Sequence, residues 1–189
     1  MQRKLFVDLG HSKRWPGAVG IKAEVDWNRA IWAALQPMLQ TLCAKKGWTL
    51  IPVPTNFLIE LSANNSLVQR IKWINARSKA SDLLLSIHGN AATNPNVRGV
   101  TTCFMGGSES ARLEAIKLSQ SYSQATGVPI WNGGAFDDRN GRFARIGMVR
   151  DTTPFALLIE AGFVTNKQDM VIDPKSVATG ICNHFTINY

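Results

Sequence analysis

The chain has 189 residues, 45% of them hydrophobic, so it is long enough to bury most of its apolar surface without disulfides or a structural metal. We therefore expect residues 1–189 to form a single domain. With 21 lysines and arginines against 13 acidic residues, the net charge is +8, which favours binding to a polyanion. The basic residues are scattered and form no basic helix, zinc finger or aromatic RNA-binding signature, which argues against nucleic acid.

Two further features bear on the compartment of the protein. The three cysteines, Cys43, Cys103 and Cys182, are too few and too far apart for a CxxC metal site, so we expect them to be reduced and buried. The N-terminal segment MQRKLFVDLGHSK lacks the apolar core of a signal peptide, and no later run approaches the length of a membrane span. We expect a soluble protein that is made in the cytoplasm and has no stable membrane insertion.

In chain order, short apolar runs alternate with amphipathic stretches. Apolar runs closed by glycine, proline or charged residues predict strands at residues 4–9, 48–53, 82–87, 99–105 and 155–160. Apolar positions that recur every three or four residues predict helices at residues 24–46, 64–79 and 108–126. The pair Asp173 and Pro174 is typical of a helix start and predicts a last helix to about residue 185. Residues 133–150 contain glycines and four arginines without a clear period, so we expect a loop with one short strand near its end.

These repeated strand, helix, strand units predict an α/β fold with a central, mostly parallel sheet and helices on both faces. Ligands bind to such sheets outside the carboxyl ends of the strands. His11 follows the first expected strand, His88 follows the third, and Glu160 ends the last. This shared position supports a functional site built from the three side chains.

Together with Glu24, in the first turn of the helix expected at 24–46, these residues offer the parts of a catalytic zinc site. Such a site needs two or three nitrogen or carboxylate ligands, an open position for water, and a separate carboxylate that takes the proton of that water. A single histidine is more often a structural residue than a metal ligand, but the four residues together favour a catalytic metal site. Glu160 follows four apolar residues, where a buried carboxylate is costly unless it is paired or linked to a metal.

Several segments in order carry a family resemblance: DLGH at 8–11, Glu24 thirteen residues on, a segment from Leu67 through Arg70 to Asn75, DLLLSIHGNA at 82–91, and VRDTTPFALLIEAGFVTN at 149–166. Together they resemble the zinc-dependent N-acetylmuramoyl-L-alanine amidases of the Amidase_3 type, from about residue 4 to about residue 170. The resemblance implies one catalytic domain with a twisted, mixed sheet of about six strands. It also implies hydrolysis of the amide bond between N-acetylmuramic acid and L-alanine in peptidoglycan.

The resemblance further implies one zinc ion held by His11, Glu24 and His88, with Glu160 as the catalytic residue. We expect Glu160 to accept the proton of the attacking water and to deliver it to the departing alanine amine. The chain has Ser12 where many relatives have a further glycine, which leaves the loop over the metal, and so the fine specificity, open. A zinc peptidase acting on small peptides and a non-catalytic wall-binding module of the same fold remain alternatives.

Peptidoglycan is then the expected partner, and anionic cell-wall polymers would satisfy the net charge of +8. A catalytic domain without a signal peptide or wall-binding repeats resembles a phage endolysin, which is made in the host cytoplasm and acts on the cell wall after release. The alternative is a secreted enzyme whose signal has been removed.

Arginines of the 133–150 segment are candidates for binding the carboxylates of the stem peptide, because a guanidinium matches carboxylate geometry. These candidates are Arg139, Arg142 and Arg145, together with Arg150. A solvated loop, or structural ion pairs with Asp137, Asp138 and Asp151, is an equally good interpretation.

A few other residues have weaker assignments. Asp8 and Asn90 flank the histidines and are candidates for hydrogen bonds that fix the imidazole tautomers. His184 lies on the last expected helix, far from any motif, and is expected at the surface. The aromatic residues that could stack on sugar faces are Trp15, Trp131 and Phe136.

Overall fold

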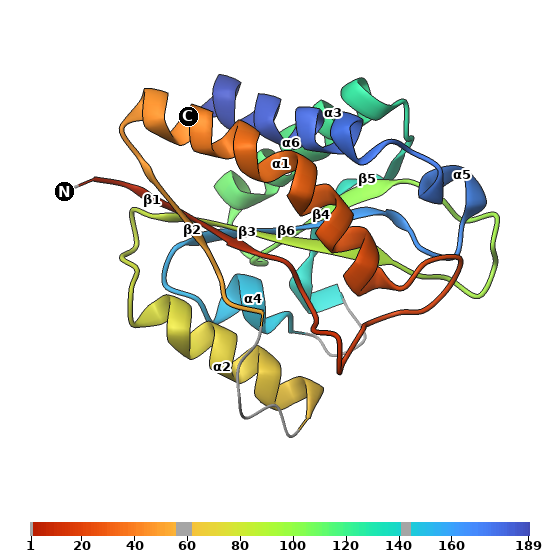
Figure 1. Cartoon of the computed structure of the whole chain (residues 1–189), viewed down its shortest axis with the longest axis horizontal. Helices are drawn as coiled ribbons and strands as arrows, with labels where there is room; N and C mark the ends of the chain where they lie inside the picture. Colours follow the sequence, from red (N-terminus) through yellow and green to blue (C-terminus); the bar gives the residue numbers. More distant parts are fainter. Residues whose placement is uncertain (1, 56–61, 141–144) are drawn as a thin grey trace.

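The computed structural model describes residues 2–55, 62–140 and 145–189, which form one sheet with helices on both sides (Figure 1). The strands are β1 (Lys4–Asp8), β2 (Thr49–Pro52), β3 (Leu83–Asn90), β4 (Val100–Phe104), β5 (Ile130–Asp137) and β6 (Phe155–Phe163). The helices are α1 (Glu24–Lys46), α2 (Ala63–Asn75), α3 (Glu109–Thr126), α4 (Gly147–Arg150), α5 (Lys167–Met170) and α6 (Pro174–Asn188), with a 3-10 turn at Asp138–Asn140.

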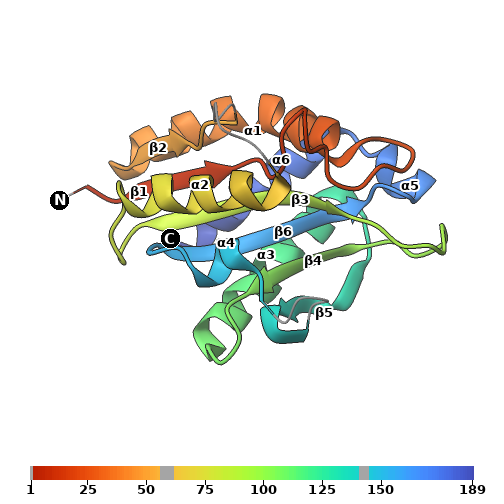
Figure 2. The same cartoon turned by 90° about the horizontal axis from the view of Figure 1, so that it is seen from below.

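The sheet has six strands in the order β2-β1-β3-β6-β4-β5. All neighbouring pairs are parallel except β4 and β6, which run antiparallel. The expected α/β fold with a mostly parallel, mixed sheet is therefore confirmed. Helices α1, α3 and α6 cover one face, and α2 and α4 cover the other (Figures 1 and 2). No helix in the described ranges is long and apolar enough to cross a membrane.

Side chains alternate between the two faces along each strand, and this alternation decides where the polar residues lie. In β3, Leu85 belongs to the larger core beneath α1, α3 and α6, whereas Leu84 belongs to the smaller core beneath α2 and α4. His88 lies four residues after Leu84 and so shares its face. Glu160 lies two residues after Leu158, which also belongs to the smaller core. Both polar residues therefore lie on the face that α2 and α4 cover only in part (Figure 2).

Helix α1 holds one metal-ligand candidate, Glu24, at its first position. The helix forms because its buried apolar residues recur every three to four positions. Acidic residues in its first turn and lysines in its last complement the helix dipole, and Gly47 ends it in a left-handed conformation with φ of 65°. Trp27 then anchors the first turn to the sheet, because its indole N–H donates to the Ala161 carbonyl oxygen of β6 at 2.8 Å. The buried apolar side chains of the helix are Val25, Trp27, Ile31, Leu35, Leu39, Leu42 and Cys43.

Two strands are longer than the sequence pattern predicts. Strand β3 continues to Asn90 and β6 to Phe163, so His88 and Glu160 lie inside paired strands and directly opposite each other. Gly89 and Gly162 interrupt the apolar pattern soon after these two residues, but the backbone ladder between β3 and β6 continues to Asn90 and Phe163. This pairing fixes the two side chains more firmly than a loop would.

The prediction for residues 133–150 is wrong. The strand of this region lies at its start, as β5, and its last four residues form the short helix α4. Strand β5 shows no apolar period because it is an edge strand, with most of its side chains exposed or only partly buried.

His184 is also misplaced by the prediction, since it is fully buried on α6 and not at the surface. It packs against the rings of Phe185 and Tyr189. The expectation failed because the helix lies between α1 and α3 and packs against both, so more of its surface is buried than in a helix at the outside of the fold. The three cysteines are free and buried, as expected.

Candidate metal centre and active site

His11, Glu24 and His88 come together at the carboxyl ends of β1 and β3, and we call these three residues the metal cluster. The Oε1 atom of Glu24 lies 2.7 Å from Nδ1 of His88 and 3.0 Å from Nε2 of His11. The two imidazole rings meet edge to face, with centroids 4.9 Å apart. One carboxylate oxygen therefore contacts a nitrogen of both histidines.

The backbone around the cluster allows this close approach. Gly10 and His11 both have φ of 54°, the left-handed region, which turns the chain sharply after β1. A Cβ atom on Gly10 would lie 2.5 Å from the His88 ring, and one on Gly17 would lie 2.3 Å from Oε2 of Glu24. The two glycines leave room for the three side chains to share one small volume.

The second carboxylate oxygen and the backbone hold Glu24 in place. The N–H of Ala18 donates to Oε2 at 3.0 Å, and the N–H of Gly89 donates to Oε1 at 3.2 Å. Burial would raise the pKa of Glu24, but the contacts with His11 and His88 outweigh it and hold the pKa well below its usual range. Burial would likewise lower the pKa of His88, but Glu24 raises it. The cluster thus carries an anion in contact with two imidazoles.

This donor set fits a divalent transition metal. The three ligand atoms lie within 4.8 Å of one another, and two imidazoles with one carboxylate are a ligand set of catalytic zinc sites. His11 is partly exposed, with 27% of its side-chain surface accessible, so the cluster can be reached from solvent. The prediction that the three side chains lie together is met by the geometry.

Glu160 lies next to the cluster without belonging to it. It is the direct cross-strand partner of His88, and its Oε2 atom is buried and has no hydrogen-bond partner in the part of the chain that is described. Burial raises the pKa of Glu160 to about 7; the neighbouring His88 acts against this rise and Glu24 adds to it. A carboxyl group with this pKa can exchange a proton near neutral pH.

A buried ion pair underlies the site, and sequence reasoning did not assign it. Both Asp8 carboxylate oxygens lie 2.7 Å from Nη1 of Arg70, and the Ser86 hydroxyl donates to Oδ2 at 2.7 Å. Burial would raise the pKa of Asp8, but Arg70 lowers it overall. Asp8 was expected to bond an imidazole; the hydrogen bonds seen here go to Arg70, Ser86 and the N–H of Gly10. The sequence marks Arg70 only as part of a motif and does not indicate its burial, because a charged residue in an amphipathic helix is usually solvated.

A cavity of about 730 Å³ opens beside the metal cluster, between the sheet and helices α2 and α4. Its walls are mostly apolar, and two arginines, Arg70 and Arg145, also line it. Of the three aromatic residues proposed to stack on sugars, Trp15 lines this cavity. Trp131 packs edge-on against Phe163, and Phe136 packs against the smaller core. The main cavity residues are His11, His88, Trp15, Leu67, Ile146, Met148, Leu158, Arg70 and Arg145.

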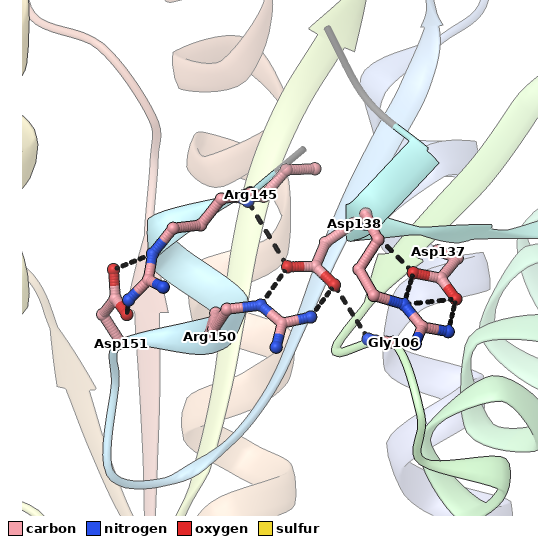
Figure 3. Close-up of polar contacts among 8 residues, drawn as sticks. Gly106, Asp137, Asp138, Arg145, Arg150 and Asp151 are labelled. Atoms are coloured by element: carbon pink, nitrogen blue, oxygen red, sulfur yellow. Dashed lines mark hydrogen bonds and ion pairs between the residues drawn. The ribbon is translucent and has the colours of Figure 1, made fainter. Parts of the chain in front are cut away.

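Arginines of the 133–150 segment are paired with aspartates, and we call these residues the arginine–aspartate cluster (Figure 3). Arg139 pairs with Asp137, Arg150 with Asp138, and Arg145 with Asp151. Asp138 is fully buried and also accepts from the N–H of Gly106 at 2.8 Å. Arg145 is the member that also lines the cavity. Arg142 lies outside the described residues.

Asn90, the last residue of β3, was proposed as a neighbour of the imidazoles. Its Oδ1 atom accepts from the N–H of Ala91 at 2.8 Å. The side chain thus caps the turn that follows β3, which is a local role.

Comparison with known proteins gives a consistent result. The model of one protein family, described as N-acetylmuramoyl-L-alanine amidase, matches residues 5–174. No curated protein matches the chain at a significant level. At the identities found among solved structures, similarity establishes the fold, whereas the family match addresses the activity.

Three solved structures illustrate the similarity of fold. The N-acetylmuramoyl-L-alanine amidase from Clostridium difficile 630 has a TM-score of 0.77 and 21% identity, covering 98% of this chain and 95% of that chain. The catalytic domain of CwlV, an N-acetylmuramoyl-L-alanine amidase from Bacillus (Paenibacillus) polymyxa var. colistinus, has a TM-score of 0.71 and 22% identity, with coverages of 98% and 97%. The catalytic domain of an endolysin targeting Clostridia difficile has a TM-score of 0.70 and 21% identity, with coverages of 98% and 97%.

Proposed function

Because the chain belongs to the N-acetylmuramoyl-L-alanine amidase family, Amidase_3, and hydrolyses the amide between N-acetylmuramic acid and L-alanine in peptidoglycan, we propose that it does so with one zinc ion held by His11, Glu24 and His88. The observation that carries this proposal is the contact of one Glu24 oxygen with a nitrogen of both histidines, at 2.7 and 3.0 Å. When bound, zinc would supply Lewis acidity that polarises the scissile carbonyl and makes a water molecule more acidic.

Glu160 is proposed to move the proton in this reaction. It lies across the strand pair from His88, and its pKa of about 7 allows it to accept a proton and to release it again near neutral pH. It first takes the proton of the attacking water and then delivers it to the nitrogen of the departing alanine. Glu24 cannot share this role, because a carboxylate that binds a metal has lost its basicity to the ion.

The cavity beside the metal cluster is proposed to hold the substrate. Its apolar walls exclude water around the scissile bond, and Trp15 offers a flat surface for a sugar ring. Arg145 is proposed to attract a carboxylate of the stem peptide, since its guanidinium reaches the cavity and is more than half exposed. Arg139 is a weaker candidate, because it is paired with Asp137 and is not among the described residues that line the cavity.

Zinc binding is tested by titrating the metal-free protein with zinc and measuring bound metal. We expect one ion per chain, and His11→Ala to lose most of the affinity. The matched control is His184→Gln, which removes the third histidine of the chain and should leave binding unchanged. Mass analysis of digested peptidoglycan should show new free lactyl groups and new L-alanine amino termini. Free peptide termini without free lactyl groups would indicate a peptidase.

Binding to anionic wall polymers is proposed from the net charge of +8. Salt shortens the screening length to about 3 Å at 1 M, so activity on whole walls should fall steeply as salt rises. Activity on a small soluble muropeptide should fall much less. Equal salt sensitivity on both substrates would contradict the attraction to polyanions.

A further inference from the structure

Glu160 has a second direct neighbour, Thr101, on the side away from His88. Strand β6 pairs in parallel with β3, which sets His88 opposite Glu160, and antiparallel with β4, which sets Thr101 opposite Glu160. Directly paired residues point to the same face of a sheet, with Cβ atoms about 5 Å apart. His88, Glu160 and Thr101 therefore form one row across three strands, and Glu160 is the middle member.

Both Thr101 and Glu160 carry a buried polar atom that lacks a partner. Thr101 is 1% exposed, and its Oγ1 makes no hydrogen bond within the described ranges; the same holds for Oε2 of Glu160. A buried hydroxyl without a partner costs about 1–3 kcal/mol, and such atoms in a native protein are rare. Valine has the same shape and would avoid this cost, so stability alone does not account for a threonine here.

The next residue, Thr102, shows what a structural threonine does in the same strand. It points to the opposite face, where its Oγ1 lies 2.9 Å from the hydroxyl of Ser119 on α3. Ser119 in turn donates to the carbonyl oxygen of Gly134 at 2.6 Å. Thr102 thus has a partner in the fold, whereas the residue that strand pairing sets opposite Thr101 is Glu160 of the candidate site.

Other groups near Glu160 are poorly suited to hold its carboxylate. His88 directs Nδ1 to Glu24. Cys103 lies on the same face as Thr101, two residues along β4, but a thiol is a weak donor. The Thr101 hydroxyl is the strong donor that the sheet places beside Glu160.

We propose that Thr101 is a positioning residue, whose hydroxyl bonds Oε2 of Glu160 through one bridging water and so holds the carboxylate with Oε1 towards the scissile bond. A hydroxyl can also accept a hydrogen bond. Thr101 therefore stays bonded after Glu160 has taken a proton, and it serves both proton transfers. This inference rests on the proposed role of Glu160 as the proton carrier.

The experiment compares Thr101→Val, which removes the hydroxyl at constant shape, with Thr101→Ser, which keeps it. Loss of one orienting hydrogen bond should lower kcat of Thr101→Val about tenfold, with KM and bound zinc unchanged, while Thr101→Ser stays within about threefold of wild type. Circular dichroism should show that Thr101→Val folds as wild type does, because the change keeps the shape of the side chain, so its loss of kcat is not a loss of fold. The control Thr102→Val should melt lower and keep its kcat.

A second variant pair separates this inference from the proposed function. Adding Thr101→Val to Glu160→Gln should cause no further loss of kcat, because the hydroxyl acts through the carboxylate. An equal loss in both backgrounds, or equal rates for Thr101→Val and wild type, overturns the inference. If Glu160→Gln itself retains wild-type turnover, the proposed role of Glu160 fails instead.

Discussion

The metal cluster with Glu160 and the arginine–aspartate cluster each contribute to the walls of one cavity, through His11 and His88 and through Arg145, yet their hydrogen bonds differ. Asp138 is buried and accepts from Arg150 and from a backbone N–H, so its bonding is satisfied within the protein. Glu160 is close to two ionisable groups and keeps an unpaired buried oxygen in the described parts of the chain. Charged groups whose hydrogen bonds are satisfied within the protein stabilise the fold, whereas a charged group with an unpaired oxygen is available to a ligand or a proton.

The largest expected effect comes from removing the metal. A chelator should abolish activity, and added zinc should restore it, because no other group in the cluster can supply Lewis acidity. The fold should survive, since the core beneath α1, α3 and α6 is built without the cluster. Activity and circular dichroism should be measured on the same chelated sample. Cooperative unfolding of the chelated protein at room temperature would show that the metal is structural, and the metal cluster would then stabilise the fold as the arginine–aspartate cluster does.

The next effect separates the two glutamates. Glu160→Gln keeps the size of the side chain and removes its capacity to take a proton, so turnover should fall about 10²–10⁴-fold with zinc still bound. Glu24→Gln removes an anionic ligand, so it should lose zinc and regain part of its activity at high zinc concentration. Bound zinc and rate should be measured on both variants side by side. The opposite pattern would mean that the two roles are exchanged.

A third prediction concerns the arginine–aspartate cluster. Asp138→Ala leaves Arg150 and the N–H of Gly106 without their acceptor, so the free energy of unfolding should fall by about 2–3 kcal/mol. Zinc content and kcat of the folded protein should not change. The matched control is Asp137→Ala, which removes an aspartate whose partner Arg139 is more than half exposed, and it should cost much less. Loss of kcat without loss of stability would place Asp138 in the active site.

Asp138 also predicts a response to acid. Burial would raise its pKa, but Arg150 and backbone N–H groups lower it overall. A lowered folded pKa means that the contribution of Asp138 is complete above its ordinary value of 3.8 and is lost as pH falls below that value. The fall in stability on acidification below about pH 4 should therefore be smaller in Asp138→Ala than in wild type.

Much of the candidate site was predictable because it depends on local patterns and on one rule of sheet geometry. His11 and His88 follow apolar runs that read as parallel strands, and the carboxyl ends of such strands meet at one edge. The partners of Asp8 were not predictable, because Arg70 is 62 positions away and shows its burial only once α2 packs on the sheet. Thr101 was missed for a related reason, since its place beside Glu160 depends on the antiparallel register of β4.

His184 sharpens the comparison, because an unpaired buried atom is not sufficient to mark a site. Its Nε2 has no hydrogen-bond partner in the described residues and lies 3.7 Å from Glu114, on helix α6 and outside the metal cluster. Burial lowers the pKa of His184 from 6.5 to about 4; the nearby Glu114 acts against this fall and Lys117 adds to it. The imidazole is therefore neutral at pH 7 and contacts aromatic rings, as an apolar side chain would.

The sign of its effect on stability follows from that lowered pKa. Between pH 6.5 and 4 the unfolded chain binds a proton at His184 and the folded chain does not, so stability falls as pH falls through this window. The full difference corresponds to roughly 3 kcal/mol. Urea unfolding at pH 7 and pH 4.5 should show a smaller loss in His184→Gln than in wild type. Equal losses in both proteins would mean that His184 is protonated in the folded state.

The smallest expected effect tests Arg145, the residue that belongs to both regions. Asp151 pairs with its guanidinium, as in a structural pair, but the same group lines the cavity beside His11. Its charge is partly neutralised and largely exposed, so Arg145→Gln should raise KM for a soluble muropeptide by only about three- to fivefold, with kcat unchanged. The matched control, Arg139→Gln, removes an arginine that is paired and exposed in the same way but is not among the described cavity residues, so it should leave KM as it is. If both variants behave like wild type, Arg145 has a structural role only, and the arginine–aspartate cluster takes no part in substrate binding. If Arg145→Gln raises KM only for stem peptides with free carboxylates and not for amidated ones, the arginine–aspartate cluster contributes one positive charge, that of Arg145, to substrate binding.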